Sequence, residues 1–134
     1  MASRNTVKMR RDIVADGLNA IQNANMAGRE TVKISIISNV LVEILKIMKQ
    51  KGAIKKYKIN GKEKSVTVTL GDVTKCRAVK PRFTASKDEV EKYRRRYLPA
   101  RKVGTLVVST NKGLMAHEDA QEQNLGGVLI AYFY

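Results

Sequence analysis

Histidine and cysteine are almost absent from the sequence, which has one of each, His117 and Cys76. A single cysteine cannot form an intramolecular disulfide, so nothing indicates the oxidising environment of secreted proteins. One histidine and one cysteine are also too few for a structural zinc site, which needs about four ligands. We therefore expect no disulfide, no metal and no cofactor.

Long apolar runs are missing as well. No stretch reaches the roughly 18 apolar residues of a membrane-spanning helix. Residues 1–11 are polar and basic and lack the apolar core of a secretion signal. The glycines fit neither the Walker spacing nor the dinucleotide-binding spacing. These absences predict a cytoplasmic protein with no membrane contact and no small-molecule substrate.

Two residues invite an enzymatic interpretation. His117 precedes two acidic residues, a combination that can support acid–base catalysis. The sequence places it on a short exposed helix, however, which favours a surface or capping role. Cys76 lies between two basic residues, which could lower its thiol pKa, but a half-buried thiol at a strand end is the simpler interpretation. We expect that the protein is not an enzyme, although sequence alone does not exclude a site assembled from distant residues.

Positive charge is what the sequence has in excess. The formal net charge is +14 and the pI is about 10.1, whereas solubility needs a net charge of only about 2–8 in a small domain. Such an excess favours a polyanionic partner, first nucleic acid and then an anionic membrane surface. The membrane is the less favoured of the two, because the basic helix around Arg94 has too small an apolar side for an interfacial helix. Two alternatives stay open: a generic DNA-binding or chromatin-type module, and a scaffold whose basic face meets an acidic protein.

The charge is concentrated in the middle of the chain. Residues 31–72 have net charge +6 and residues 73–102 have +8, whereas residues 103–134 have −2. The peak is Arg94, Arg95 and Arg96, with a tyrosine on either side. Arginines can neutralise phosphates, and arginine and tyrosine planes can stack on bases. We therefore predict an RNA contact there; the alternative is an ordinary solvated helix face.

Periodicity and turn signals predict the secondary structure. In the first half they indicate a helix over 12–26 capped by Asp12 and ended by Gly28, a strand over 31–36, a helix capped by Ser38 and ended by Gly52, and a hairpin with strands 54–59 and 64–70. In the second half they indicate an interrupted strand over 78–84, a helix opened by a capping box at 86–89, a strand over 105–110, a helix over 115–123 and a strand over 128–134.

These elements predict an α+β fold of two small packed lobes. The N-terminal lobe, residues 1–70, has the order α-β-α-β-β, and the C-terminal lobe, residues 71–134, is mixed β/α. Because the last thirty residues are net acidic, bulk charge cannot explain binding there. They nevertheless contain the polar run Ser109-Thr110-Asn111-Lys112-Gly113 at the end of an apolar strand.

This polar run has the chemistry of an RNA contact. Hydroxyl groups both donate and accept hydrogen bonds, which suits ribose 2′-hydroxyls and base edges. Lys112 can contact a phosphate, and Gly113 lets the backbone turn and approach a ligand closely. A helix beginning near Met115 would add the positive end of its dipole. The alternative interpretation is an ordinary polar turn between a strand and a helix.

The run resembles a motif of the small-subunit ribosomal protein S8 family. The resemblance extends through Ala116-His117-Glu118-Asp119-Ala120 and Gly126-Gly127 to the aromatic C-terminal strand, and Lys80-Pro81-Arg82-Phe83 resembles the archaeal and eukaryotic branch. It covers nearly the whole chain from residue 12. Asn111 stands where the family often has serine, and it keeps the ability to form hydrogen bonds.

The resemblance implies a two-lobed α+β protein of the ribosome. It implies binding to a helix in the central domain of small-subunit rRNA early in assembly, with neighbouring small-subunit proteins as further partners. It places Ser109, Thr110, Lys112 and Gly113 at the main RNA contact. It also implies a secondary contact in the first lobe, near Asp12, Asn23 and Ser38.

Overall fold

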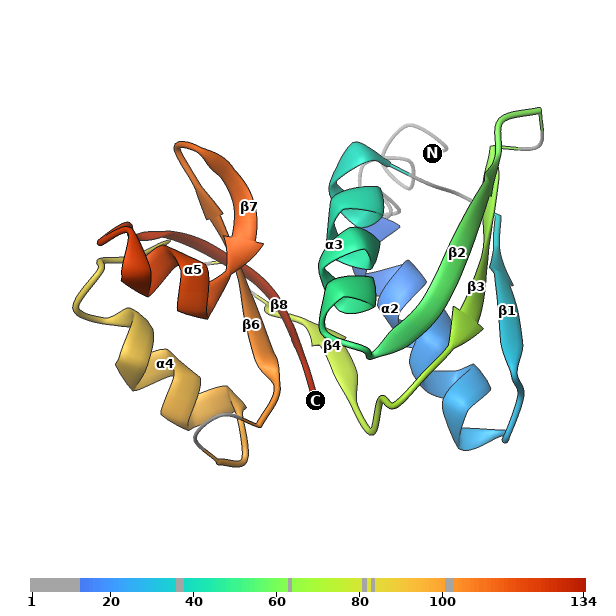
Figure 1. The fold of residues 1–134 in the computed structure, drawn as a ribbon, viewed down its shortest axis with the longest axis horizontal. Coiled ribbons are helices and arrows are strands. Elements are labelled where there is room, and N and C mark those ends of the chain that lie inside the picture. Colours follow the sequence, from blue (N-terminus) through green and yellow to red (C-terminus); the bar gives the residue numbers. More distant parts are fainter. Residues whose placement is uncertain (1–12, 36–37, 63, 81, 83, 101–102) are drawn as a thin grey trace, which may run out of the picture.

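The computed structural model describes residues 13–35, 38–62, 64–80, 82, 84–100 and 103–134. The first half has the elements α2 (Ile13–Met26), β1 (Thr31–Ile34), α3 (Asn39–Gln50), β2 (Ile54–Asn60) and β3 (Ser65–Leu70). Its three strands form an antiparallel sheet in the order β1-β3-β2, and both helices cover one face of it (Figure 1). The predicted order α-β-α-β-β is confirmed.

The helix ends follow the predicted signals. The hydroxyl of Ser38 accepts a hydrogen bond from the backbone N–H of Leu41 at 3.2 Å, which caps α3 as expected. Gly28, with φ +73°, follows α2, and Gly52, with φ +82°, follows α3. Asp12, the predicted cap of α2, lies outside the described residues.

The hairpin between β2 and β3 forms at the predicted Asn60-Gly61 turn, but its loop is longer than an Asn-Gly pair needs. Pairing ends at Asn60 and Ser65, so four residues rather than two separate the paired strands. The Asn60 side chain accepts a hydrogen bond from the N–H of Lys62 at 3.2 Å, and Lys64 takes a φ of +51°. This local hydrogen bond stabilises a wider turn than the two-residue hairpin.

The second half forms another antiparallel sheet. Its strands are β4 (Cys76–Ala78), β5 (Thr84–Ala85), β6 (Thr105–Thr110), β7 (Gly113–Ala116) and β8 (Gly127–Phe133), in the order β4-β8-β6-β7, with β5 also on β8. Two helices, α4 (Val90–Tyr97) and α5 (His117–Glu122), lie beside it. The α+β class is confirmed, as are strand 105–110 and a final strand after the paired glycines.

The predicted interrupted strand over 78–84 is represented by two short strands. β4 and β5 pair with opposite ends of β8: Ala78 lies opposite Ala131 and Thr84 opposite Val128. One prediction in this half was wrong. The predicted helix from Met115 begins two residues later, because Met115 pairs with Val108 as part of β7. Here pairing with a neighbouring strand overrides the local pattern.

Two hydrophobic clusters hold the structure together. The larger packs α2 and α3 on the first sheet and extends into the second half through Val107, Ile130 and Phe133. The smaller joins α4 to the second sheet through residues such as Val90, Leu98 and Leu106. The larger core therefore crosses residue 71, and the division into lobes 1–70 and 71–134 stays a prediction. None of the described helices is long and apolar enough to cross a bilayer.

Candidate nucleic-acid interface

The predicted contact at 109–113 is the end of a β-hairpin. Thr110 pairs with Gly113 across the ends of β6 and β7, and Asn111 and Lys112 form the turn. The Thr110 hydroxyl donates to the Gly113 carbonyl at 2.9 Å and accepts from the Lys112 N–H at 3.1 Å. The predicted strand-to-helix turn is therefore incorrect, and no helix begins at Met115 to direct its dipole at a ligand.

The residues of this hairpin turn differ in what they present to solvent. Asn111, Lys112 and Gly113 are exposed, Ser109 is half-buried and Thr110 is buried. Since the Thr110 hydroxyl already makes two hydrogen bonds, it orders the turn. The Ser109 hydroxyl makes no hydrogen bond within the described part of the chain. Gly113 has a φ of +114°, which side chains rarely allow, so the turn requires glycine there.

The paired glycines at the start of β8, Gly126 and Gly127, pack closely against the neighbouring strands. Gly127 lies so close to Ser109 that a Cβ on it would overlap the Ser109 carbonyl group. A Cβ on Gly126 would lie 2.6 Å from the Ala85 carbonyl oxygen and 2.8 Å from the Lys87 nitrogen. Only residues without side chains let β8 approach β6 and β5 so closely. The resemblance to the family motif thus has a physical basis, because the second glycine sets the position of Ser109.

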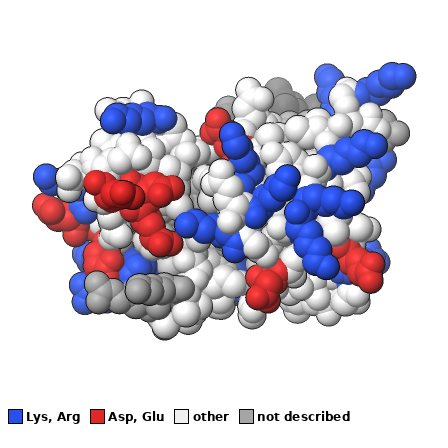
Figure 2. Space-filling model, in the orientation of Figure 1, with Lys and Arg blue, Asp and Glu red and all other residues white. Residues whose placement is uncertain are grey.

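Charge is distributed unevenly around the hairpin. Acidic side chains gather over α5, whereas basic side chains gather over α3 and β2 (Figure 2). Glu118 at the start of α5 forms an ion pair with Lys51 at 3.6 Å. Lys112 is the one basic residue of segment 103–134. Attraction of a polyanion from a distance must therefore come from outside this segment.

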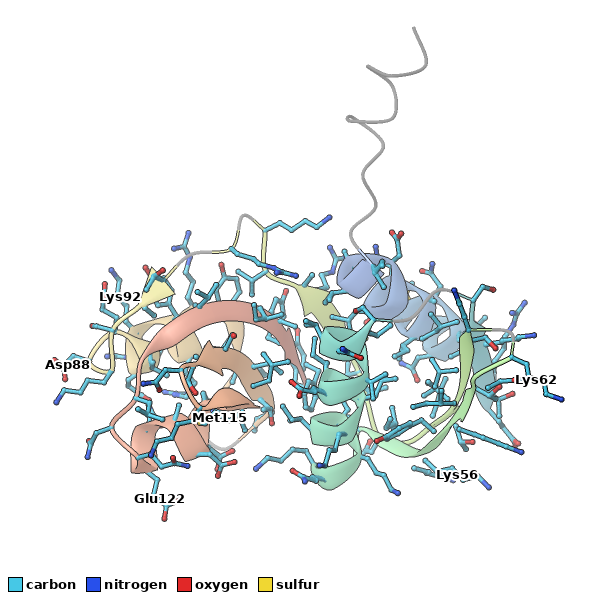
Figure 3. All side chains as sticks on the ribbon, turned by 90° about the horizontal axis from the view of Figure 1, so that it is seen from above. Lys56, Lys62, Asp88, Lys92, Met115 and Glu122 are labelled. Carbon is cyan, nitrogen blue, oxygen red and sulfur yellow. The ribbon has the colours of Figure 1, made fainter. Side chains whose placement is uncertain are left out.

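The strongest concentration of exposed positive charge in the first half is a group that we call the lysine cluster. Its members come from the second half of α3, from β2 and from the following loop: Lys46, Lys49, Lys55, Lys56, Lys58, Lys62 and Lys64. Figure 3 shows Lys56 and Lys62 at the opposite end of the molecule from Lys92 of α4. The net charge of this segment was evident from the sequence, but the common location of these lysines was not, because it depends on how β2 packs beside α3.

The three predicted arginines of α4 do not act as one surface. Arg94 is buried, and its guanidinium contacts the Glu91 carboxylate at 2.7 and 2.9 Å. Arg95 and Arg96 are exposed. The helix also lies away from the hairpin turn, beyond α5 (Figure 1). Arg94 therefore faces the protein, and only its two neighbours present free positive charge to a ligand.

The predicted contacts in the first half also lie apart. Asn23 is exposed near the end of α2, whereas Ser38 caps the start of α3. A 14-residue helix is about 21 Å long, and the end of α2 lies away from the start of α3 (Figure 1). The start of α3, which Ser38 caps, lies on the same side of the molecule as the hairpin turn, whereas the end of α2 does not (Figure 1). Asp12 lies outside the described residues.

A model of one protein family, described as ribosomal protein S8, matches residues 12–134. The chain belongs to the ribosomal protein S8 family. It is 41% identical to the small ribosomal subunit protein uS8 of Nanoarchaeum equitans, over 94% of this chain and 100% of the relative. It is 44% identical to the uS8 protein of Archaeoglobus fulgidus, over 92% of this chain and 98% of the relative. The resemblance recognised in the sequence is thereby confirmed.

The two residues considered for catalysis are both buried in this S8-family chain. The thiol of Cys76 is fully buried and donates to the Leu18 carbonyl at 3.2 Å. Burial raises its pKa to about 12, the reverse of the lowering that its basic neighbours suggested. His117 is buried rather than exposed, and its Nδ1 accepts a hydrogen bond from the Leu106 N–H at 3.0 Å. Burial also lowers the pKa of His117, which keeps the imidazole neutral.

Each buried group therefore has a structural role. His117 ties the first residue of α5 to the backbone of β6, and Cys76 ties β4 to α2. Among the described residues, no group of three or more His, Cys, Asp or Glu side chains is placed to hold a metal ion. For Cys76 the sequence predicted a half-buried thiol at a strand end, and the thiol is instead fully buried against α2. The burial of His117 was missed, because it depends on how α5 packs against β6.

Proposed function

We propose that the chain is a structural component of the small ribosomal subunit that binds a helix of the central domain of its rRNA and supports assembly there. The curated relatives are named as proteins of that subunit. The observation that carries the proposal is the hairpin turn, whose conformation is fixed by the hydroxyl of Thr110 and by Gly127 beneath Ser109. A fixed turn can present hydrogen-bonding groups without losing much entropy on binding.

Different parts of the protein supply specificity and attraction. The Ser109 hydroxyl, the Asn111 amide and the Lys112 ammonium match ribose hydroxyls, base edges and a phosphate, respectively. Their region is otherwise acidic, so non-specific attraction there is weak. The lysine cluster, Arg95 and Arg96 would neutralise phosphates and contribute affinity that does not depend on RNA sequence. Neighbouring small-subunit proteins are expected to occupy surfaces that the RNA leaves open.

Substitutions in the hairpin turn test this division. Ser109→Ala combined with Lys112→Ala should lower affinity for a central-domain rRNA fragment about tenfold or more, from the loss of one hydrogen bond and one phosphate contact. Affinity for an unrelated RNA duplex of equal length should change much less. Ser35→Ala, at an exposed serine outside the turn, is the matched control. Equal losses on both RNAs would contradict specific recognition by the hairpin.

The role of the arginines needs a separate measurement. Arg95→Ala with Arg96→Ala should reduce the salt dependence of binding on any RNA, by about one unit of slope per lost phosphate contact. Lys56→Ala with Lys58→Ala should act in the same way. An unchanged slope in either pair would mean that those side chains do not contact phosphates in the complex.

A further inference from the structure

A hollow of about 380 Å³ lies between α2 of the first half and β4, β8 and α4 of the second. Its polar and aromatic lining comes from Asn19, Arg77, Lys80, Tyr97 and Tyr132, and small apolar residues complete it. The volume is within the range of about 300–1,000 Å³ that ligand sites occupy. The hollow is separate from the hairpin turn: Ser109 pairs with Val128, and Tyr132 lies four residues further along β8, about 14 Å away.

The lining combines three kinds of group. The rings of Tyr97 and Tyr132 have centroids 5.1 Å apart and an interplanar angle of 31°, so they pack against each other and form an aromatic wall on one side of the hollow. Arg77 is exposed and forms no ion pair with any residue that the structure describes. The Asn19 amide, also exposed, forms no hydrogen bond within the same part of the chain. No described residue of the lining is acidic.

This set of groups matches the parts of a nucleotide. Aromatic side chains stack on any base, a carboxamide can both donate to and accept from a base edge, and a guanidinium binds a phosphate through paired hydrogen bonds. Burial raises the pKa of Tyr132, so its hydroxyl remains protonated as a further donor. An acidic peptide would satisfy Arg77 but would leave the aromatic wall and the amide without partners.

We propose that this hollow receives one unpaired nucleotide of the bound RNA, with its base against Tyr132 and Tyr97, its edge on Asn19 and its phosphate on Arg77. The proposal rests on the proposed function, because it assumes that RNA is the ligand. It adds a second contact, distinct from the hairpin turn, that reads an unstacked nucleotide. Since α2 and β8 both line the hollow, residues from both halves of the chain would contact the same nucleotide.

The test uses the full chain with two probes, the central-domain rRNA fragment and a short single-stranded RNA, a uridine hexamer. Asn19→Ala and Arg77→Ala change exposed side chains and should leave folding intact. Each should lower affinity for both probes about five- to tenfold. Arg29→Ala, which removes an exposed arginine from the loop after α2, is the matched control and should change affinity less than twofold.

Ultraviolet cross-linking followed by mass spectrometry supplies a second readout. Cross-links to the peptides that contain Tyr97 or Tyr132 are expected, and Tyr132→Phe should keep them because the ring remains.

If Arg77→Ala behaves like Arg29→Ala and the cross-links fall elsewhere while the rRNA fragment still binds, the hollow is not the site and the proposed function stands. If the hexamer binds in the hollow but the rRNA fragment binds no more tightly than unrelated RNA, the proposed function is wrong. The hollow is then still a nucleotide-binding site. If neither probe binds, both proposals are wrong.

Discussion

The hydroxyl of Thr110 provides the sharpest test of how the hairpin turn is built. Thr110→Val keeps the branched shape of the side chain and removes the oxygen that donates to Gly113 and accepts from Lys112, at 2.9 and 3.1 Å. Each hydrogen bond contributes about 1 kcal/mol net, and water can partly replace them at an exposed turn. We expect a loss of about 1–2 kcal/mol in the free energy of unfolding. Because the turn is no longer held, affinity for the rRNA fragment should fall by up to about tenfold.

Urea denaturation and fluorescence anisotropy with the labelled rRNA fragment measure the two effects on the same preparations. Thr110→Ser, which retains the hydroxyl, should stay close to the unmodified protein in both assays. Thr67→Val is the matched control, because Thr67 is an exposed strand residue. Full stability and full affinity in Thr110→Val would refute the reasoning. Lost affinity with unchanged stability would mean that the hydroxyl touches the RNA itself.

Three further predictions concern the packing around the hairpin. Gly127→Ala should cost about 1–3 kcal/mol of stability and weaken rRNA binding, because the added methyl group displaces Ser109; circular dichroism melting and a binding assay check this. Cys76 should react with a thiol reagent near pH 8 about a thousandfold more slowly in the folded than in the urea-unfolded chain, because a pKa of about 12 instead of 9.0 lowers the thiolate fraction by that factor. His117 should destabilise the fold as the pH falls below 6.5, its ordinary pKa, because the unfolded chain binds a proton that the folded chain resists. The pH dependence of urea unfolding should flatten in His117→Gln.

Elements with local signals were predictable from the sequence. Helix α3 has a capping serine at Ser38, apolar residues at helical spacing and a glycine at its end, and all three agree with the structure. Strand β6 is a short apolar run between turn residues and has the predicted bounds. Such signals lie within a few residues of the element, so contacts with distant parts of the chain change its bounds little.

Features that depend on distant pairing were not predictable in the same way. Met115 lies in a segment with helical character, yet it forms β7 because β6 offers it a partner. The burial of Arg94 could have been found, because Val90, Arg94 and Leu98 are spaced four residues apart and share the buried side of α4. The hollow beside Tyr132 had no such signal, since its lining comes from four elements between residues 15 and 132.

The most direct test of the central claim compares the central-domain rRNA fragment with a DNA duplex of equal length across a salt series. If the hairpin turn recognises the RNA, a preference for the rRNA fragment should persist as rising salt removes the non-specific attraction of the basic side chains. Equal affinities that fall together with salt would contradict the account. The positive charge would then bind any nucleic acid, and the hairpin turn would recognise none.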